Sequence, residues 1–175
     1  MTHPWQAQSL DVPRFAESAG HLRLQTPVAD LPRLLSVCDA AGPSAVDVVC
    51  DWTLTGELRG SSTRRQAWLR LQAQVDLPQR CQRCLAPMSM ELVVDRWFRF
   101  VADEATALAE DDDSEEDLLV ISSELDTFSL LEDELLMALP LVISHGDCQT
   151  PASPALVDDL PHPFAALASL KKPGL

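Results

Sequence analysis

Three stretches of alternating apolar and polar side chains constrain the fold of this chain more than any other feature. They cover residues 46–58, 67–77 and 88–101. The middle stretch is the most regular, with apolar members at Ala67, Leu69, Leu71, Ala73, Val75 and Leu77. Successive side chains of a strand point to opposite faces of a sheet, so this period predicts strands with one buried and one solvated face. Such strands usually pair antiparallel.

Helical patterns flank these strands. A short amphipathic helix is predicted within residues 26–38, with Asp30 as its cap, and a fourth short strand at residues 118–121. The principal helix is predicted from Asp126 to Leu139, because apolar residues follow a helical stripe there and Pro140 then ends the helix. We therefore predict an α+β fold: a small antiparallel sheet or partly open barrel, one principal helix after the strands, and short N- and C-terminal helices.

The length of 175 residues suits one domain with tails. We expect a loosely ordered N-terminal arm at residues 1–25 and a single domain at residues 26–148. Within that domain residues 102–117 carry nine acids, which predicts a flexible excursion. A proline-rich tail at residues 149–175 is predicted to end in a short helix. The start lacks a signal-like segment, and the longest apolar run of nine residues is too short for a bilayer, so we expect a cytoplasmic protein with no membrane partner.

The formal net charge of −14 conceals two segments of opposite sign. Residues 59–99 hold eight arginines and three acids, whereas residues 103–134 hold fourteen acids and neither lysine nor arginine. An acidic chain is a poor non-specific ligand for DNA, because that affinity depends on cationic groups. The arginines could form a basic face, or they could be solvated strand positions that face the acidic segment of the same chain.

Two pairs of metal-ligand residue types share one spacing. Cys81 and Cys84 are three positions apart, and so are His145 and Cys148. Together they supply the four sulfur and nitrogen ligands of a structural zinc site. Leu85 stands where zinc knuckles commonly have glycine. Two alternatives stay open at this stage: a dithiol redox pair at Cys81 and Cys84, and reduced cysteines without a metal.

Catalytic motifs are missing from the sequence. It contains no nucleophile elbow, phosphate-binding glycine loop or dinucleotide fingerprint. The two remaining cysteines, Cys38 and Cys50, fall on apolar stripes and are most simply core residues. We therefore expect a protein that is not an enzyme, with a structural zinc as its one candidate cofactor.

Arginines accompany the cysteines and an aromatic pair. The residues considered as RNA or phosphate contacts are Arg80, Arg83, Arg96, Trp97 and Arg99. Guanidinium groups beside aromatic rings can hold phosphates and stack on unpaired bases, although aromatics in a core with arginines at its edge give the same pattern. The acidic residues considered as contacts to a basic partner are Asp111, Asp112, Asp113, Glu115 and Glu116.

Three blocks of the sequence resemble the YceD family, the bacterial large ribosomal RNA subunit accumulation proteins. The first block is residues 81–85, between two predicted strands, and the second is residues 131–141 followed by His145 and Cys148. The third is residues 163–171, near the end. The blocks occur in the family's order and span roughly residues 40–172.

This resemblance implies a non-enzymatic factor for the synthesis, processing or stability of 23S ribosomal RNA and for assembly of the large ribosomal subunit. It implies as partners a precursor large subunit, 23S ribosomal RNA or a basic ribosomal protein. It transfers no catalytic residue to this chain. The alternatives are a dithiol redox enzyme and a zinc-stabilised interaction module with an unrelated partner.

Overall fold

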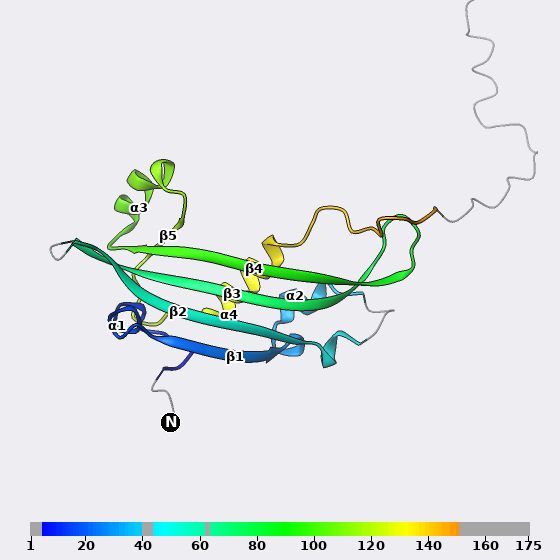
Figure 1. Ribbon diagram of the computed structural model, residues 1–175, viewed down its shortest axis with the longest axis horizontal. Coiled ribbons are helices and arrows are strands. Elements are labelled where there is room, and N and C mark those ends of the chain that lie inside the picture. The colour runs from blue at the N-terminus through cyan, green and yellow to red at the C-terminus, as the bar shows by residue number, and fades with distance from the viewer. Residues whose placement is uncertain (1–4, 40–43, 62–63, 151–175) are drawn as a thin grey trace, which may run out of the picture.

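One long curved sheet forms the frame of the molecule, which a computed structural model describes over residues 5–39, 44–61 and 64–150 (Figure 1). Its strands are β1 (His21–Pro27), β2 (Val49–Ser61), β3 (Arg64–Arg80), β4 (Pro87–Val101) and β5 (Asp117–Val120). They lie in the order β1-β2-β3-β4-β5. The first three pairings are antiparallel, and β5 pairs parallel to β4.

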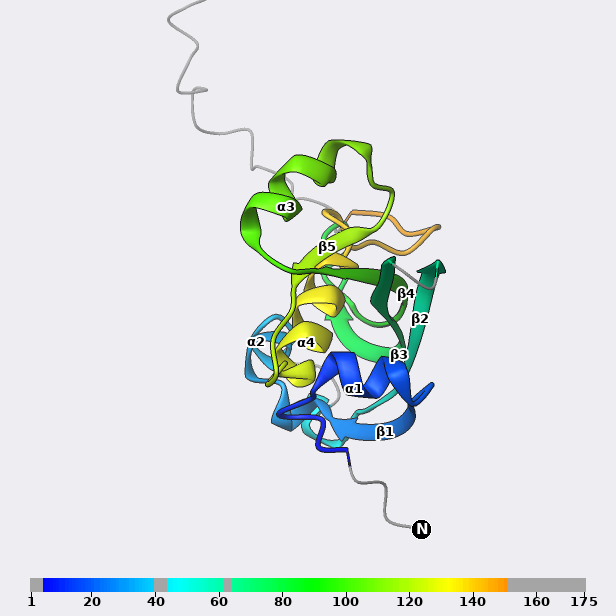
Figure 2. The same cartoon turned by 90° about the vertical axis from the view of Figure 1, so that its left-hand side faces the viewer.

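In the described part of the chain, three short helices accompany one principal helix. They are α1 (Val12–Glu17), α2 (Pro32–Ser36), α3 (Glu104–Glu110) and α4 (Thr127–Met137), with 3-10 turns η1 (Val28–Asp30), η2 (Ala45–Asp47) and η3 (Asp111–Asp113). Figure 2 shows α2 and α4 on one face of the sheet, with α3 beyond its end beside β5. The predicted α+β class, with an open sheet and one main helix after the strands, is confirmed.

The core lies between the sheet and α4. Its alternate strand positions are fully buried, as the period of two predicts, and they meet the apolar stripe of the helix. The members with almost no exposed surface include Trp52, Leu54, Leu71, Phe98, Leu131 and Leu135. Each such side chain contributes about 1.5–3 kcal/mol by leaving water. The indole Nε1 of Trp52 donates to the hydroxyl of Thr26 at 2.9 Å, so its polar group is satisfied within the core.

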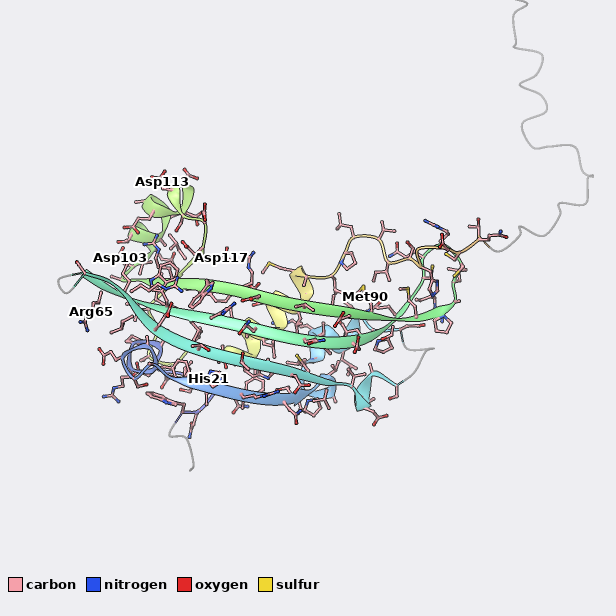
Figure 3. All side chains as sticks on the ribbon, in the orientation of Figure 1. His21, Arg65, Met90, Asp103, Asp113 and Asp117 are labelled. Carbon is pink, nitrogen blue, oxygen red and sulfur yellow. The ribbon has the colours of Figure 1, made fainter. Side chains whose placement is uncertain are left out.

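The long β3–β4 hairpin separates two distant surfaces. Its register pairs Arg80 with Pro87 at the closed end and Trp68 with Arg99 at the other. The cysteine motif follows the closed end, whereas the acidic excursion follows the other end. Figure 3 shows Arg65 and Asp103 together at the excursion end, far from Met90.

The N-terminal segment differs from the predicted loosely ordered arm. Residues 12–17 form α1, and β1 begins at His21. Val12 and Phe15 are fully buried, and Leu10 exchanges backbone hydrogen bonds with Leu125. A helix of six residues is too short to show a periodic pattern in sequence, so the composition gave no sign that this segment completes the core.

Two further segments differ from their predictions in detail. The helix expected over residues 26–38 is divided into η1 and α2, and the N-cap of α2 is Leu31 rather than Asp30. The acidic excursion contains α3 and η3, neither of which has a buried residue. Its flexibility stays a prediction, and the expected C-terminal helix lies outside the described residues.

The structure also bears on membrane crossing. Among the described residues, no helix has the length and apolar content that would let it cross a membrane.

Candidate metal centre

The first half of the candidate metal centre is the turn that joins β3 to β4. The N–H of Cys81 donates to the carbonyl of Ala86 at 3.0 Å, and the N–H of Leu85 donates back to the carbonyl of Cys81 at 2.9 Å. Leu85 has a φ of 62°, the left-handed conformation that glycine adopts most readily. The turn therefore has the backbone that a knuckle requires, although leucine occupies the position where glycine is common.

A second loop lies against this turn. The N–H of Gln82 donates to the carbonyl of Ile143 at 2.8 Å, which places the segment after α4 beside the hairpin. The N–H of His145 then donates to Sγ of Cys81 at 3.5 Å. As a result, one ligand atom from each of Cys81, Cys84, His145 and Cys148 lies within 4.8 Å of every other. The structure brings together all four residues that the sequence singled out.

Two distances within this cluster match those of a tetrahedral zinc site. Zn–S bonds of about 2.3 Å and a Zn–N bond of about 2.0 Å place two sulfurs about 3.8 Å apart, and a sulfur and a nitrogen about 3.5 Å apart. Sγ of Cys81 lies 3.6 Å from Sγ of Cys148, and Sγ of Cys84 lies 3.4 Å from Nδ1 of His145. Mixed sulfur and nitrogen donors are also the set that zinc accepts.

The thiol of Cys81 is prepared for the thiolate form in which cysteine binds a metal. Desolvation by burial raises its pKa, but hydrogen bonds from the backbone N–H groups of Cys84 and His145 favour the charged form and lower the pKa to about 5. Burial raises the pKa of the Cys148 thiol, and hydrogen bonds with Cys81 and Cys84 raise it further. Two thiols that contact each other do not ionise equally, and a cation between them would stabilise both thiolates.

The geometry does not favour the dithiol alternative. Thioredoxin-like pairs precede a helix in a βαβ setting, whereas Cys81 and Cys84 lie in an antiparallel hairpin. Sγ of Cys81 is 3.6 Å from Cys148, a residue outside the CxxC motif. Cys50 is fully buried, and its pKa is raised to about 12, mainly by burial. Burial also raises the pKa of Cys38. These two cysteines are packed thiols, as the sequence indicated.

The structure does not gather the predicted RNA-contact residues into one surface. Arg80 pairs with Asp39 at 3.3 Å near the closed end of the hairpin, where Arg83 is also exposed. Arg96 faces the helices and pairs with Asp117 at 2.6 Å and Glu134 at 3.6 Å. Arg99 and Trp97 lie on the opposite face of β4, because side chains alternate along the strand.

Sequence reasoning missed two residues that lie beside Trp97 and Arg99, namely Arg59 and Trp68. The guanidinium of Arg59 lies 3.9 Å from the centroid of Trp97 and 4.3 Å from that of Trp68, so it contacts both rings, which meet each other edge to face. Trp68 pairs with Arg99 across the strands and is 8% exposed. The register of β2, β3 and β4 places these residues side by side. No local sequence pattern reveals that register.

The acidic excursion binds back onto the arginines. Arg99 pairs with Glu110 at 2.5 Å, and Arg96 pairs with Asp117. This matches the alternative in which arginines face acids of the same chain. The residues predicted to contact a basic partner lie between these two pairs, and Asp111, Asp112, Asp113 and Glu115 are exposed, while Glu116 is half-buried and accepts from Ser114 at 3.4 Å.

Comparison with known proteins now assigns the chain to a family. Residues 69–171 match the family model described as "Large ribosomal RNA subunit accumulation protein YceD". The chain belongs to the YceD family. The YceD match begins within β3, includes all four residues of the candidate metal centre, and continues through α4.

A curated relative is similar to this chain over part of its length. The protein named "Large ribosomal RNA subunit accumulation protein YceD" from Haemophilus influenzae is 34% identical over 110 residues, which cover 57% of this chain. The aligned part spans 62% of that relative, less than two thirds of its length. No solved structure matches this YceD chain.

Proposed function

We propose that this chain is a non-enzymatic factor that supports accumulation of 23S ribosomal RNA and assembly of the large ribosomal subunit in the cytoplasm. The observation that carries the proposal is the family match, which includes the β3–β4 hairpin, the Cys/His cluster and α4. The proposed partners are a precursor large subunit, 23S ribosomal RNA and a basic ribosomal protein.

The charge distribution suits such partners. The exposed carboxylates of η3 form an acidic surface, and ribosomal proteins rich in lysine and arginine would be attracted to it. Arginines are available for RNA, with Arg80 and Arg83 at the closed end of the hairpin and Arg99 at the other end. Contacts through Arg80 and Arg83 would lie at the opposite end of the molecule from the acidic surface, whereas Arg99 lies beside it.

Deletion and sedimentation test the proposed function. We expect that deletion lowers the ratio of 23S to 16S ribosomal RNA, and that the tagged protein cosediments with precursor large subunits. The ratio should recover when the wild-type gene is restored. Normal 23S levels after deletion, together with absence of the protein from every precursor fraction, would exclude this function.

We propose further that Cys81, Cys84, His145 and Cys148 hold one structural Zn²⁺. The match of the two ligand distances to a tetrahedron supports this assignment. Four protein ligands leave no open position, so the ion would stabilise the fold rather than catalyse. It would join the loop after α4 to the β3–β4 hairpin, where the described contacts include the Gln82 to Ile143 hydrogen bond.

Elemental analysis of protein purified without chelator tests the zinc proposal. We expect about one zinc per chain in the wild type and less than about a tenth in C84S and H145A, because a structural site requires all four ligands. C38S is the matched control, since Cys38 is a packed thiol outside the cluster. Wild-type protein with no more zinc than C84S would refute the site, and it would leave the proposed function untouched.

A further inference from the structure

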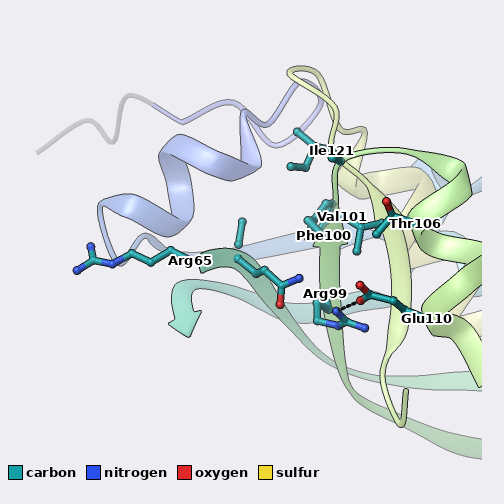
Figure 4. Close-up of a pocket in the computed structure, with 10 residues that line it drawn as sticks. Arg65, Arg99, Phe100, Val101, Thr106, Glu110 and Ile121 are labelled. Carbon is teal, nitrogen blue, oxygen red and sulfur yellow. Dashed lines mark hydrogen bonds and ion pairs between the residues drawn. The ribbon is translucent and has the colours of Figure 1, made fainter. Parts of the chain in front are cut away.

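A pocket at the far end of the β3–β4 hairpin has the side chains of an anion site. Its volume is about 480 Å³, and it lies between α3 on one side and the adjoining ends of β3 and β4 on the other. The polar residues lining it are Arg65, Gln66, Arg99, Thr106 and Glu110. Figure 4 shows Arg99 and Glu110 facing each other inside, while Arg65 extends outward from the rim. Apart from Glu110, each of these side chains can donate hydrogen bonds to an anion.

Arg99 is the centre of this pocket. Its side chain is only 13% exposed, and Nη1 donates to Oε2 of Glu110 at 2.5 Å. Nη2 donates to the hydroxyl of Ser114 at 3.0 Å. Arg65 at the rim is exposed and forms no ion pair with any described residue. The pocket therefore contains one arginine neutralised by an internal carboxylate and one that still carries uncompensated charge.

The segment that supplies Glu110 is weakly held. Neither α3 nor η3 has a buried residue, so releasing them from the sheet would expose little apolar surface. Glu110 is 44% exposed, so water competes for its carboxylate even though Arg99 is only 13% exposed. An external anion can therefore replace this carboxylate on Arg99 at low cost.

An aromatic surface adjoins the same pocket. Trp68 is the cross-strand partner of Arg99, and Trp97 precedes Arg99 by two positions on the same face of β4. Arg59 contacts both rings, and Arg70 lies 5.4 Å from the centroid of Trp97. The indole Nε1 of Trp68 is buried without a hydrogen-bond partner among the described residues. This surface combines π faces with guanidinium groups, the two features on which unpaired bases stack.

We propose that this pocket binds a phosphate of single-stranded RNA, which takes the place of the Glu110 carboxylate on Arg99, while an adjacent base stacks at the Arg59–Trp97 surface. Arg65 would contact the next phosphate at the rim. The inference rests on the proposed function and identifies the RNA contact within it. An acidic protein segment would use the arginines but would gain nothing from the tryptophans, so the observations favour RNA.

Binding of a fluorescein-labelled oligouridylate, followed by anisotropy across a range of salt concentrations, tests the proposal. R65A should weaken binding and reduce the slope of log K against log salt by about 0.7, the effect of losing one phosphate contact on a single strand. E110Q removes the competing charge but keeps an acceptor for Arg99, so it should tighten binding by about two- to fivefold. R23A is the matched control, because it removes an exposed arginine from β1 at the opposite edge of the sheet.

The outcomes separate the site from the function. Equal weakening by R65A and R23A, with no gain in E110Q, would show that RNA responds to net charge alone and would overturn the site. Tighter binding of polyglutamate than of the oligouridylate would assign the pocket to an acidic protein and also overturn it. Either result is compatible with loss of 23S ribosomal RNA on deletion, whereas normal 23S levels on deletion would contradict the proposed function itself.

Discussion

The backbone N–H of Leu85 donates to the carbonyl oxygen of Cys81 at 2.9 Å while Leu85 itself has a φ of 62°. The hydrogen bond closes the turn that presents Cys81 and Cys84, and the left-handed backbone at Leu85 then directs the chain to Ala86, whose carbonyl accepts from the N–H of Cys81 at 3.0 Å. For a residue with a Cβ this conformation costs roughly 1–2 kcal/mol. The candidate metal centre therefore contains a local strain that a glycine would relieve.

Replacing Leu85 with glycine should stabilise the protein. Leu85 is 57% exposed, so little burial is lost, and relief of the left-handed strain should raise the free energy of unfolding by about 0.5–1 kcal/mol. Urea denaturation of zinc-loaded protein measures the change. L85A is the control, because alanine keeps the Cβ and should change stability by less than about 0.5 kcal/mol. Equal stability of L85G and L85A would contradict the strain.

Glu132 should be one of the most stabilising polar residues. Its carboxylate on α4 accepts from the backbone N–H groups of Arg33 at 2.6 Å and Leu34 at 3.0 Å, and so caps α2 from almost 100 residues away. It also pairs with Nε of Arg33 at 2.8 Å, although only 5% of the residue is exposed. E132A should lower the free energy of unfolding by about 2–4 kcal/mol, because it removes the buried acceptor and leaves the N–H donors of Arg33 and Leu34 unpaired.

Thermal and urea denaturation measure this loss, with D133A as the matched control. Asp133 pairs with the same Arg33 but its side chain is 52% exposed, so its removal should cost less than about 1 kcal/mol. E132Q should lie between the two variants because the amide can still accept a hydrogen bond. A loss in E132A no larger than in D133A would show that the cap contributes nothing.

Gly56 should tolerate no side chain, because α1 lies directly against it. A Cβ there would lie 2.6 Å from Cδ1 of Phe15 and 3.0 Å from the backbone N of Ala16. G56A should therefore cost about 1–3 kcal/mol, the range of an overpacked core. G146A, where no atom lies within 4 Å of the added Cβ, is the control in a urea denaturation series. Little change in G56A would mean that α1 does not hold the packed position described.

The predictable part of the fold is the part with a regular period. The alternation at residues 67–77 specified the buried face of β3 because Leu69, Leu71 and Val75 are all buried there. The same reasoning failed at residues 12–17, since one turn and a half of helix shows no period. It also failed at Asp30, because the cap of α2 comes from Glu132, and a cap so distant in sequence leaves no local signal.

The candidate metal centre was predictable because ligand chemistry is encoded in residue type. Two pairs spaced by three positions suffice to suggest four ligands, and the loop after α4 then brings them together. The arginine surface was not predictable in the same way. Arg96 and Arg99 are three positions apart, so they lie on opposite faces of β4, while Arg59 joins Trp97 only through the register of the strands.

Glu134 should make the stability depend on pH in a direction opposite to that of a typical surface carboxylate. Burial raises the pKa of this group; Arg96 offsets the shift, while Asp117 and Asp133 add to it. A pKa above the unfolded value of about 4.3 means that the native state binds the proton more tightly. The stabilisation is thus complete at low pH and is lost as the pH rises through the native pKa.

E134Q cannot ionise, so its free energy of unfolding relative to the wild type should increase from pH 4 to pH 7 in urea titrations. E115Q, which removes an exposed carboxylate, controls for the loss of one charge. A difference between E134Q and wild type that stays constant with pH would show that Glu134 is not shifted in this direction.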